Sequence, residues 1–265
     1  MLGRIAGVVI LTAFGAGGPG GTTEPVLRTA GTLTVCAYAH FTPISYGVGQ
    51  GYEADLLRAV ARRWGVQPAF IPIEVFDGIW LAPVGPDPGC DVAIGGISPT
   101  ADREAQGAVF GPRTASFAQS LLVRKQDFDS GRVTGFPSFA GTSMVIGVVP
   151  GTTGAMYARQ RAAEASLPST VLREYPSEDE LLPALKAGQI QAIARGEIGN
   201  RYQQQLDPTL LTIDLRDFGE GFAMALDPAN ATLPDALVRA LNTVSDGGAV
   251  GYPQWSENPR VFDEA

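Results

Sequence analysis

The chain is poor in the residues that bind metals and activate nucleophiles. Its 265 residues include one histidine, His40, and two cysteines, Cys36 and Cys90. A structural zinc site built from these residue types usually needs four ligands, so three cannot complete one. A Ser-His-Asp triad would have to use His40 as its base. Most zinc and triad chemistry is therefore excluded, and we expect neither a catalytic residue nor a cofactor.

Basic residues are also scarce. Lysine and arginine total 19 against 27 aspartates and glutamates, which gives a formal charge of −8. A chain with this balance and no basic run lacks the charge that non-specific binding to nucleic acid requires. Apolar residues make up 45% and charged residues 17%, which is the composition of a folded protein. The length fits one large domain or two small ones, and we expect a monomer that does not bind nucleic acid.

No hydrophobic run is long enough to span a bilayer. Arg4 is followed by an apolar stretch over 5–14 and then by the segment GAGGPGG. This stretch is about half of the ~20 residues that a membrane span needs, and its flanks resemble those of a secretory signal peptide. We therefore predict a signal peptide and flexible leader over 1–30, and a mature protein in the periplasm or outside the cell. An uncut membrane anchor is the alternative.

Export would permit a disulfide between Cys36 and Cys90. Cys36 lies inside a strand-like segment, and Cys90 directly precedes another. If these strands are parallel neighbours in register, the two residues are offset by roughly 10 Å, which is too far for a bridge. Freedom of the loop at Gly89 leaves the bridge open as the alternative.

Short β-rich runs alternate with helical patterns after the leader, which is typical of βαβ units around a parallel sheet. Leu56, Val60 and Trp64 recur at four-residue spacing and Gly65 follows, which predicts an amphipathic helix over 51–65. Strands are predicted around this helix in a first unit, at 33–38, 68–73, 91–98 and 120–125.

A second unit follows with the same alternation. Strands are predicted at 143–149, 190–194 and 221–226. Three helices are predicted, one directly after PGTTG, one over 177–186 and one over 234–245. Two units that are joined near 125 and again near 220 imply that the chain crosses twice between two lobes. We predict an α/β fold with a central cleft, in which lobe 1 comprises 31–125 and 220–265 and lobe 2 comprises 126–219.

The segment DVAIGGISPTADREA at 91–105 carries the strongest functional signal. A buried strand ends at a Gly-Gly pair, exposes Ser98 and delivers Arg103 to the start of the next segment. Ligands of parallel α/β sheets bind beyond the carboxyl ends of the strands. Arg103 is therefore placed to hold a carboxylate through a two-pronged, charge-assisted contact. The alternative is a solvated surface arginine beside its acidic neighbours.

A second candidate anion site is the sequence PGTTG at 150–154, where a strand turns into a helix. Backbone amides at the start of a helix, together with the hydroxyls of Thr152 and Thr153, can bind an anion without a charged side chain. An ordinary helix cap is the alternative.

The chain resembles the bacterial extracellular solute-binding proteins of family 3, the amino-acid-binding components of ABC importers. The segments LTVCAYAHFTPISY, GYEADLLRAVA, DVAIGGISPTADRE, GVVPGTTG and ALKAGQIQAIA occur in the order seen in that family, over roughly 31–256. The resemblance implies a periplasmic-binding-protein type II fold, whose two lobes close on a polar amino acid.

The resemblance also implies the ligand contacts. Phe41 and Phe76 correspond to aromatic walls of the cleft, whose faces attract an ammonium group. Gly96 and Ser98 correspond to backbone and hydroxyl contacts to the amino acid, and Arg103 to the anchor of its α-carboxylate. The other positions are Thr152 and Thr153, which contact the carboxylate from the second lobe, and Tyr38, where an acidic residue often supports a basic ligand.

One position departs from the family pattern. The family usually places an aspartate after the strand IQAIA, where it receives the α-ammonium group. Here Gly196 stands at the aligned position, with Glu197 beside it. Either Glu197 takes this role through its longer reach, or the role is absent.

We therefore predict that the two lobes trap a small polar amino acid or a similar zwitterion and deliver it to the membrane subunits of an ABC importer. Two alternatives fit the same fold. An exported dehydratase similar to cyclohexadienyl dehydratases would need Glu197 or His40 as its general acid. A ligand-sensing protein that reports to a membrane receptor needs the same closing cleft.

Overall fold

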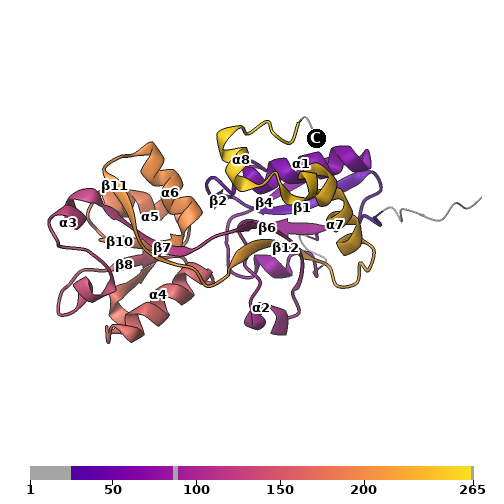
Figure 1. Ribbon diagram of the computed structural model, residues 1–265. Coiled ribbons are helices and arrows are strands. Elements are labelled where there is room, and N and C mark those ends of the chain that lie inside the picture. Colours follow the sequence, from indigo (N-terminus) through magenta and orange to yellow (C-terminus); the bar gives the residue numbers. More distant parts are fainter. Residues whose placement is uncertain (1–24, 86–88, 264–265) are drawn as a thin grey trace, which may run out of the picture.

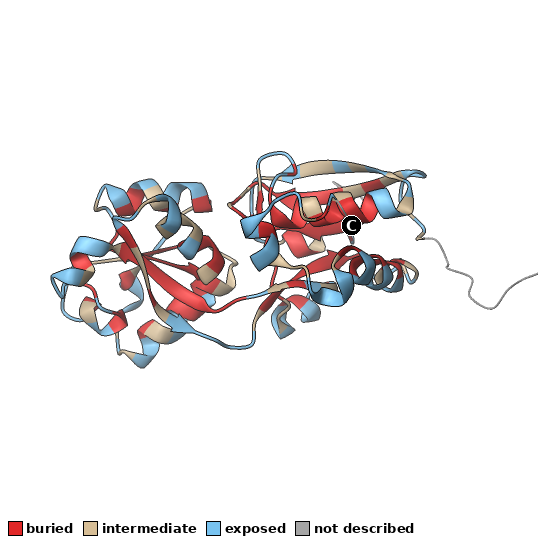
Figure 2. Ribbon diagram, turned by 45° about the horizontal axis from the view of Figure 1, so that its top comes forward, coloured by how far each residue is buried: buried red, intermediate tan, exposed pale blue. Residues whose placement is uncertain are grey.

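The computed structural model describes residues 25–85 and 89–263, so residues 1–24 of the predicted signal peptide and leader lie outside this range. The chain forms two α/β lobes that lie side by side and are joined by extended segments (Figure 1). Buried residues concentrate on the central strands and on the inner faces of the helices in each lobe (Figure 2). The two-lobed α/β architecture predicted from the sequence is thus present.

The first lobe is built on a five-stranded sheet with the order β4-β1-β5-β12-β6. β1 pairs in parallel with β4 and β5, whereas β12 is antiparallel to β5 and β6. The strands are β1 (Thr32–Tyr38), β4 (Gln67–Ile73), β5 (Val92–Ile94), β6 (Val109–Ser116) and β12 (Gly221–Leu226), with a hairpin of β2 (His40–Phe41) and β3 (Ser45–Tyr46). The helices are α1 (Tyr52–Trp64), α2 (Ala101–Ala105), α7 (Leu233–Val244) and α8 (Tyr252–Glu257).

The second lobe has a sheet of order β11-β7-β10-β8-β9. Its central strands β7 and β10 are antiparallel, and β10, β8 and β9 run in parallel. The strands are β7 (Gln119–Arg124), β8 (Ile146–Val148), β9 (Leu172–Glu174), β10 (Ala192–Gly196) and β11 (Leu210–Arg216). The helices are α3 (Lys125–Asp129), α4 (Thr153–Glu164), α5 (Glu178–Lys186) and α6 (Glu197–Leu206).

β7 lies in a different sheet from the one predicted. It pairs with β10 and β11, so the segment 120–125 belongs to the second sheet rather than to the first unit. The chain passes between the sheets at 117–118, and it returns at 217–220. The predicted lobe boundary at 125 therefore lies beyond β7. An apolar run such as that of β7 indicates burial, but it does not say which sheet buries it.

Cys36 and Cys90 form a disulfide, with their Cα atoms 5.8 Å apart. The predicted separation of the two residues was therefore wrong. That prediction measured the offset between the two residues by the rise of strands in register, but β5 begins only at Val92. Cys90 lies before the strand, so the strand rise does not fix its distance from Cys36.

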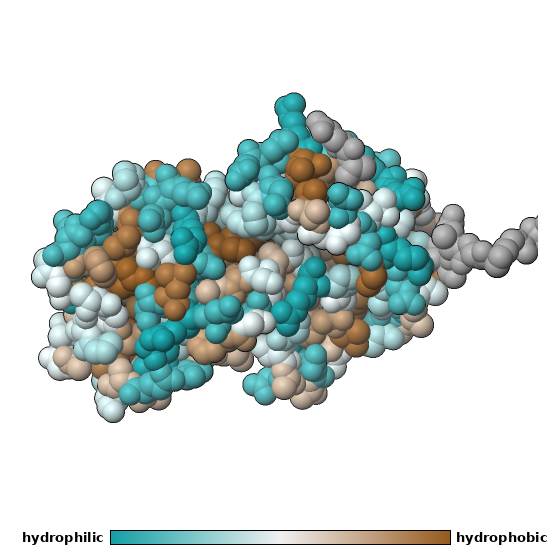
Figure 3. Space-filling model, in the orientation of Figure 1, coloured by the Kyte–Doolittle hydropathy of each residue, from teal (hydrophilic) through white to brown (hydrophobic). Residues whose placement is uncertain are grey.

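On the face shown in Figure 3, hydrophilic and hydrophobic residues are mixed over both lobes, and the outline narrows between them. Among the helices of 25–85 and 89–263, none has the length and apolar character needed to cross a membrane.

Candidate functional site

A small cavity of about 30 Å³ lies where the two lobes meet. Pockets that hold a small-molecule ligand are usually ~300–1,000 Å³. Six residues predicted as ligand contacts line it: Tyr38, Phe41, Phe76, Gly96, Thr152 and Thr153. The other lining residues were not predicted as contacts: Phe117, Gly154, Glu178, Arg195, Gly196 and Phe222.

Aromatic rings form most of the wall on the side of the first lobe. Tyr38 and Phe76 meet edge to face with centroids 5.2 Å apart, and Phe117 stacks on Phe222 at 4.2 Å. Phe41 contacts the same Phe222 ring edge to face at 5.8 Å. Phe117 lies where the chain leaves the first sheet for the second, and Phe222 lies just after it returns. This position beside the two crossovers is the sequence signal that could have identified both as cleft residues.

The Gly-Gly pair after β5 turns the chain into the cleft. The amides of Gly95 and Gly96 both donate to the carboxylate of Glu53 at 2.9 Å, and the hydroxyl of Thr114 donates to the other Glu53 oxygen at 2.6 Å. Gly96 has φ 71°, and a Cβ atom there would lie 2.6 Å from the Phe41 ring. Glycine is therefore required for this backbone to approach the aromatic wall.

Arg103 lies beside the cavity and connects the two lobes. Its guanidinium donates to the carbonyl of Ser98 in the first lobe and, at 2.7 Å, to the carbonyl of Gly151 in the second. The group lies 4.3 Å from the centroid of the Trp80 ring and 5.4 Å from that of Phe76. Only 2% of Arg103 is exposed, so the alternative of a solvated surface arginine is wrong.

The positive charge of Arg103 is not neutralised by an ion pair within the described residues. Burial lowers the pKa of its guanidinium to about 10, while the negative charges of Asp77 and Glu220 act in the opposite direction. Its Nε atom is buried without a hydrogen-bond partner in the described protein. Arg103 therefore stays charged at neutral pH and can make further contacts with an anion.

The start of α4 faces this arginine from the second lobe. The hydroxyl of Thr152 caps the helix by accepting the amide of Ala155 at 3.1 Å, as the cap interpretation predicted. Thr153 Oγ1 lies 3.4 Å from Ser98 Oγ across the cleft and accepts a hydrogen bond from Gln119 at 3.0 Å. The positive end of the helix dipole thus points towards the same region as Arg103.

A buried ion pair between Arg195 and Glu178 lies on the side of the second lobe. The Arg195 guanidinium donates to Glu178 at 3.1 Å, to Asn200 Oδ1 at 2.7 Å and to the carbonyl of Gly199 at 3.1 Å. The two side chains are 6% and 7% exposed. Burial raises the pKa of the Glu178 carboxyl, and the charge of Arg195 opposes this rise.

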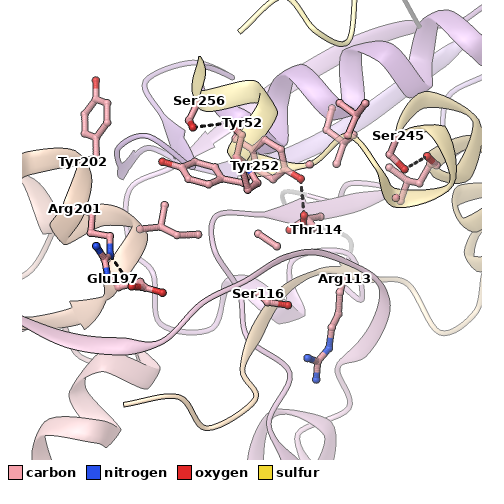
Figure 4. Close-up of a pocket in the computed structure, with 18 of the residues that line it drawn as sticks. Tyr52, Arg113, Thr114, Ser116, Glu197, Arg201, Tyr202, Ser245, Tyr252 and Ser256 are labelled. Atoms are coloured by element: carbon pink, nitrogen blue, oxygen red, sulfur yellow. Dashed lines mark hydrogen bonds and ion pairs between the residues drawn. The ribbon is translucent and has the colours of Figure 1, made fainter. Parts of the chain in front are cut away.

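Glu197 does not line the cleft cavity. Its carboxylate accepts the amide of Ala118 at 3.2 Å and pairs with Arg201 at 2.7 Å. It faces a separate groove of about 700 Å³ between α6 and the C-terminal segment, where Tyr52 and Tyr252 also lie (Figure 4). This groove is larger than the cleft cavity, but none of the other residues predicted as ligand contacts lines it.

His40 lies at the rim of the cleft rather than in the cavity. Its Nδ1 atom is 2.7 Å from Asp179 in the second lobe, and its Nε2 atom is 2.7 Å from Glu74 in the first. Burial lowers the pKa of the imidazole, but its hydrogen bonds to the two carboxylates outweigh this effect and raise the pKa. Neither His40 nor Glu197, the two residues considered as a general acid, reaches the cavity.

Several solved structures share this architecture. An ancestral arginine-binding protein bound to arginine matches with a TM-score of 0.71 and 22% identity, over 88% of this chain and 97% of that one. An amino acid ABC transporter substrate-binding protein from Streptococcus pneumoniae, bound to L-arginine, matches with a TM-score of 0.72 and 20% identity, over 88% and 94%. An ancestral amino acid-binding protein that is a precursor of cyclohexadienyl dehydratase matches with a TM-score of 0.69 and 22% identity, over 88% and 95%.

These likenesses, at such low identity, establish the type II periplasmic-binding-protein fold. A comparison with curated protein sequences gives no match. The model of the bacterial extracellular solute-binding proteins, family 3, matches residues 33–244, which is most of the chain. The chain therefore belongs to family 3 of the bacterial extracellular solute-binding proteins.

Proposed function

We propose that this protein is exported, binds a small, amino-acid-like solute by its carboxylate between the two lobes, and delivers it to an ABC importer. The observation that carries the proposal is the placement of Arg103. A buried guanidinium whose described partners are backbone carbonyls lies opposite the start of α4. Both groups favour a negative charge at the point where the lobes meet.

Closure of the lobes is part of the proposal. The cavity of about 30 Å³ is far smaller than the ligand pockets of ~300–1,000 Å³ usual in proteins, so the lobes must separate to admit a solute. Contacts such as Arg103 to Gly151 join the lobes in the closed form. A ligand that touches both lobes binds the closed form better, and this difference in affinity is what shifts the population towards closure.

Thermal unfolding in the presence of amino acids and small carboxylates tests the proposal. A ligand that binds only the folded protein stabilises it by ~2.7 kcal/mol at about 100 times its Kd. We expect carboxylates to raise the melting temperature, and the matching amides, which lack the charge, to leave it unchanged. If no carboxylate in the panel raises it, the proposal fails.

Closure is also expected to weaken as the pH rises through the pKa of His40. Only the protonated imidazole can donate to both Asp179 and Glu74, and its pKa in the closed form lies above its ordinary value of 6.5. The contribution of this contact is therefore complete below about pH 6.5 and is lost as the pH rises through the raised pKa. Because both carboxylates are exposed, the pair between the lobes is worth less than about 1 kcal/mol, or at most about a fivefold change in affinity.

Calorimetry between about pH 5.5 and pH 8.5, on the wild type and on His40→Gln, measures this effect. Because His40 is the one histidine of the chain, its imidazole NMR signals report the pKa without ambiguity. The account of the contact is wrong if the variant keeps the same pH dependence as the wild type.

A further inference from the structure

We infer that the ligand of the cleft is a carboxylate with an apolar body and without an α-ammonium group. The inference rests on the proposed function, because it concerns the ligand of the same cavity. It follows from the groups that line the cavity, since each charged group of a buried ligand needs a partner of opposite charge or a set of hydrogen bonds.

The end of β10 offers no partner for an ammonium group. Gly196 lines the cavity there without a side chain, and a Cβ atom on it would lie 3.0 Å from the ring of Phe117. An apolar ring therefore occupies the direction in which a side chain at this position would project. A ligand group that lies against this point meets carbon atoms.

The carboxylate that lines the cavity is already neutralised. Glu178 pairs with Arg195, and the three guanidinium nitrogens of Arg195 all donate within the second lobe. A ligand ammonium group that shared Glu178 with Arg195 would place a second buried positive charge on one carboxylate. The pair is therefore a closed unit of zero net charge.

Two further carboxylates near the cleft are occupied by other donors. Glu53 accepts the amides of Gly95 and Gly96 and the hydroxyl of Thr114. Glu197 faces the separate groove and pairs with Arg201. Asp77 and Glu220 also act on Arg103, but neither lines the cavity, and Glu220 accepts the side-chain amide of Gln119. Arg103 has no ion pair within the described residues, and a carboxylate of the ligand can supply one.

Apart from the hydroxyls of Tyr38, Thr152 and Thr153, the remaining wall is mostly apolar and fits an apolar body. The rings of Phe41, Phe76, Phe117 and Phe222 line the cavity, and each is at most 7% exposed. Their faces could attract an ammonium group, but such a contact is weaker than the cost of burying that group without a counter-charge. Aromatic or branched aliphatic carboxylates match these walls and the unpaired charge of Arg103.

Matched pairs of ligands test the inference by calorimetry: 3-phenylpropanoate against L-phenylalanine, and 4-methylpentanoate against L-leucine. The members of each pair share the carboxylate and the apolar body and differ in the α-ammonium group. We expect the carboxylate without the ammonium group to bind at least tenfold more tightly in at least one pair. We also expect 3-phenylpropanamide, which lacks the charge, not to bind.

Other outcomes separate the two proposals. If the amino acids bind as tightly as their partners or more tightly, the inference is overturned while the proposed function stands. If no member of either pair binds, the inference is again overturned, and the proposed function then depends on the wider panel of carboxylates.

The double variant Glu178→Gln/Arg195→Gln gives a second readout, because it removes both charges of the pair together. We expect it to change the affinities for both members of a pair by the same factor. A selective loss of affinity for the amino acid would identify Glu178 as the partner of an ammonium group and would overturn the inference.

Discussion

Replacing Arg103 with methionine is expected to weaken the binding of a carboxylate ligand by about 10- to 100-fold. A hydrogen-bonded contact to a charged group contributes about 1.5–3 kcal/mol, and a factor of ten in affinity corresponds to about 1.4 kcal/mol. Methionine keeps much of the apolar contact with the Trp80 ring but removes the charge. Titration calorimetry with the carboxylate that gives the largest thermal shift measures the loss.

Two further variants separate the role of the charge from that of the fold. Lysine at position 103 keeps the charge but not the planar fork, so we expect an intermediate affinity. Arg63→Met removes an exposed arginine at the end of α1 and should leave the affinity unchanged. Because Arg103 also holds the carbonyls of Ser98 and Gly151, circular dichroism should establish that each variant is folded. Unchanged affinity in a folded Arg103→Met would remove Arg103 from the site.

Replacing Arg195 with methionine should lower the free energy of unfolding by about 3–5 kcal/mol, because it leaves the buried charge of Glu178 without a partner. Urea denaturation at neutral pH measures the change. Acidification should restore part of the stability. In Arg195→Met, burial holds the pKa of the Glu178 carboxyl above its value in the unfolded chain. The penalty is therefore complete at a pH above this raised pKa, shrinks as the pH falls through it, and is gone below the pKa of the unfolded chain.

Controls distinguish this effect from a general sensitivity of the second lobe. The double variant Arg195→Met/Glu178→Met removes both charges and should be more stable than Arg195→Met alone. Arg159 and Glu174 form an exposed pair in the same lobe, with 52% and 57% of their side chains accessible. Arg159→Met should therefore change the stability by less than about 1 kcal/mol. Equal losses in the buried and the exposed variants would contradict this account of the pair.

The parts of the site that could be predicted from the sequence are those set by local structure. The Gly-Gly turn, Arg103 and the threonines before α4 follow strand ends directly, and the geometry of a parallel α/β sheet places such residues at the cleft. Tyr38, Phe41 and Phe76 were predicted through the resemblance to the family, and they line the cavity.

The residues that were missed depend on long-range packing. Glu178 and Arg195 come from α5 and β10, and neither sequence pattern shows that their side chains meet. Glu197 follows the strand at a suitable position, but as the first residue of α6 its side chain turns to the backbone of Ala118 at the crossover. Sequence spacing gave the position of this carboxylate and not its direction.

The distance between the lobes tests the central claim most directly. Spin labels on Glu104→Cys in α2 and Gln160→Cys in α4, both exposed positions on opposite lobes, can be measured by double electron–electron resonance. The native cysteines are bonded to each other, so they do not react with the label. We predict that a saturating carboxylate ligand shortens the distance between the labels in the wild type, and that the same concentration has little effect in Arg103→Met. An identical distance with and without bound ligand would contradict closure of the lobes around it.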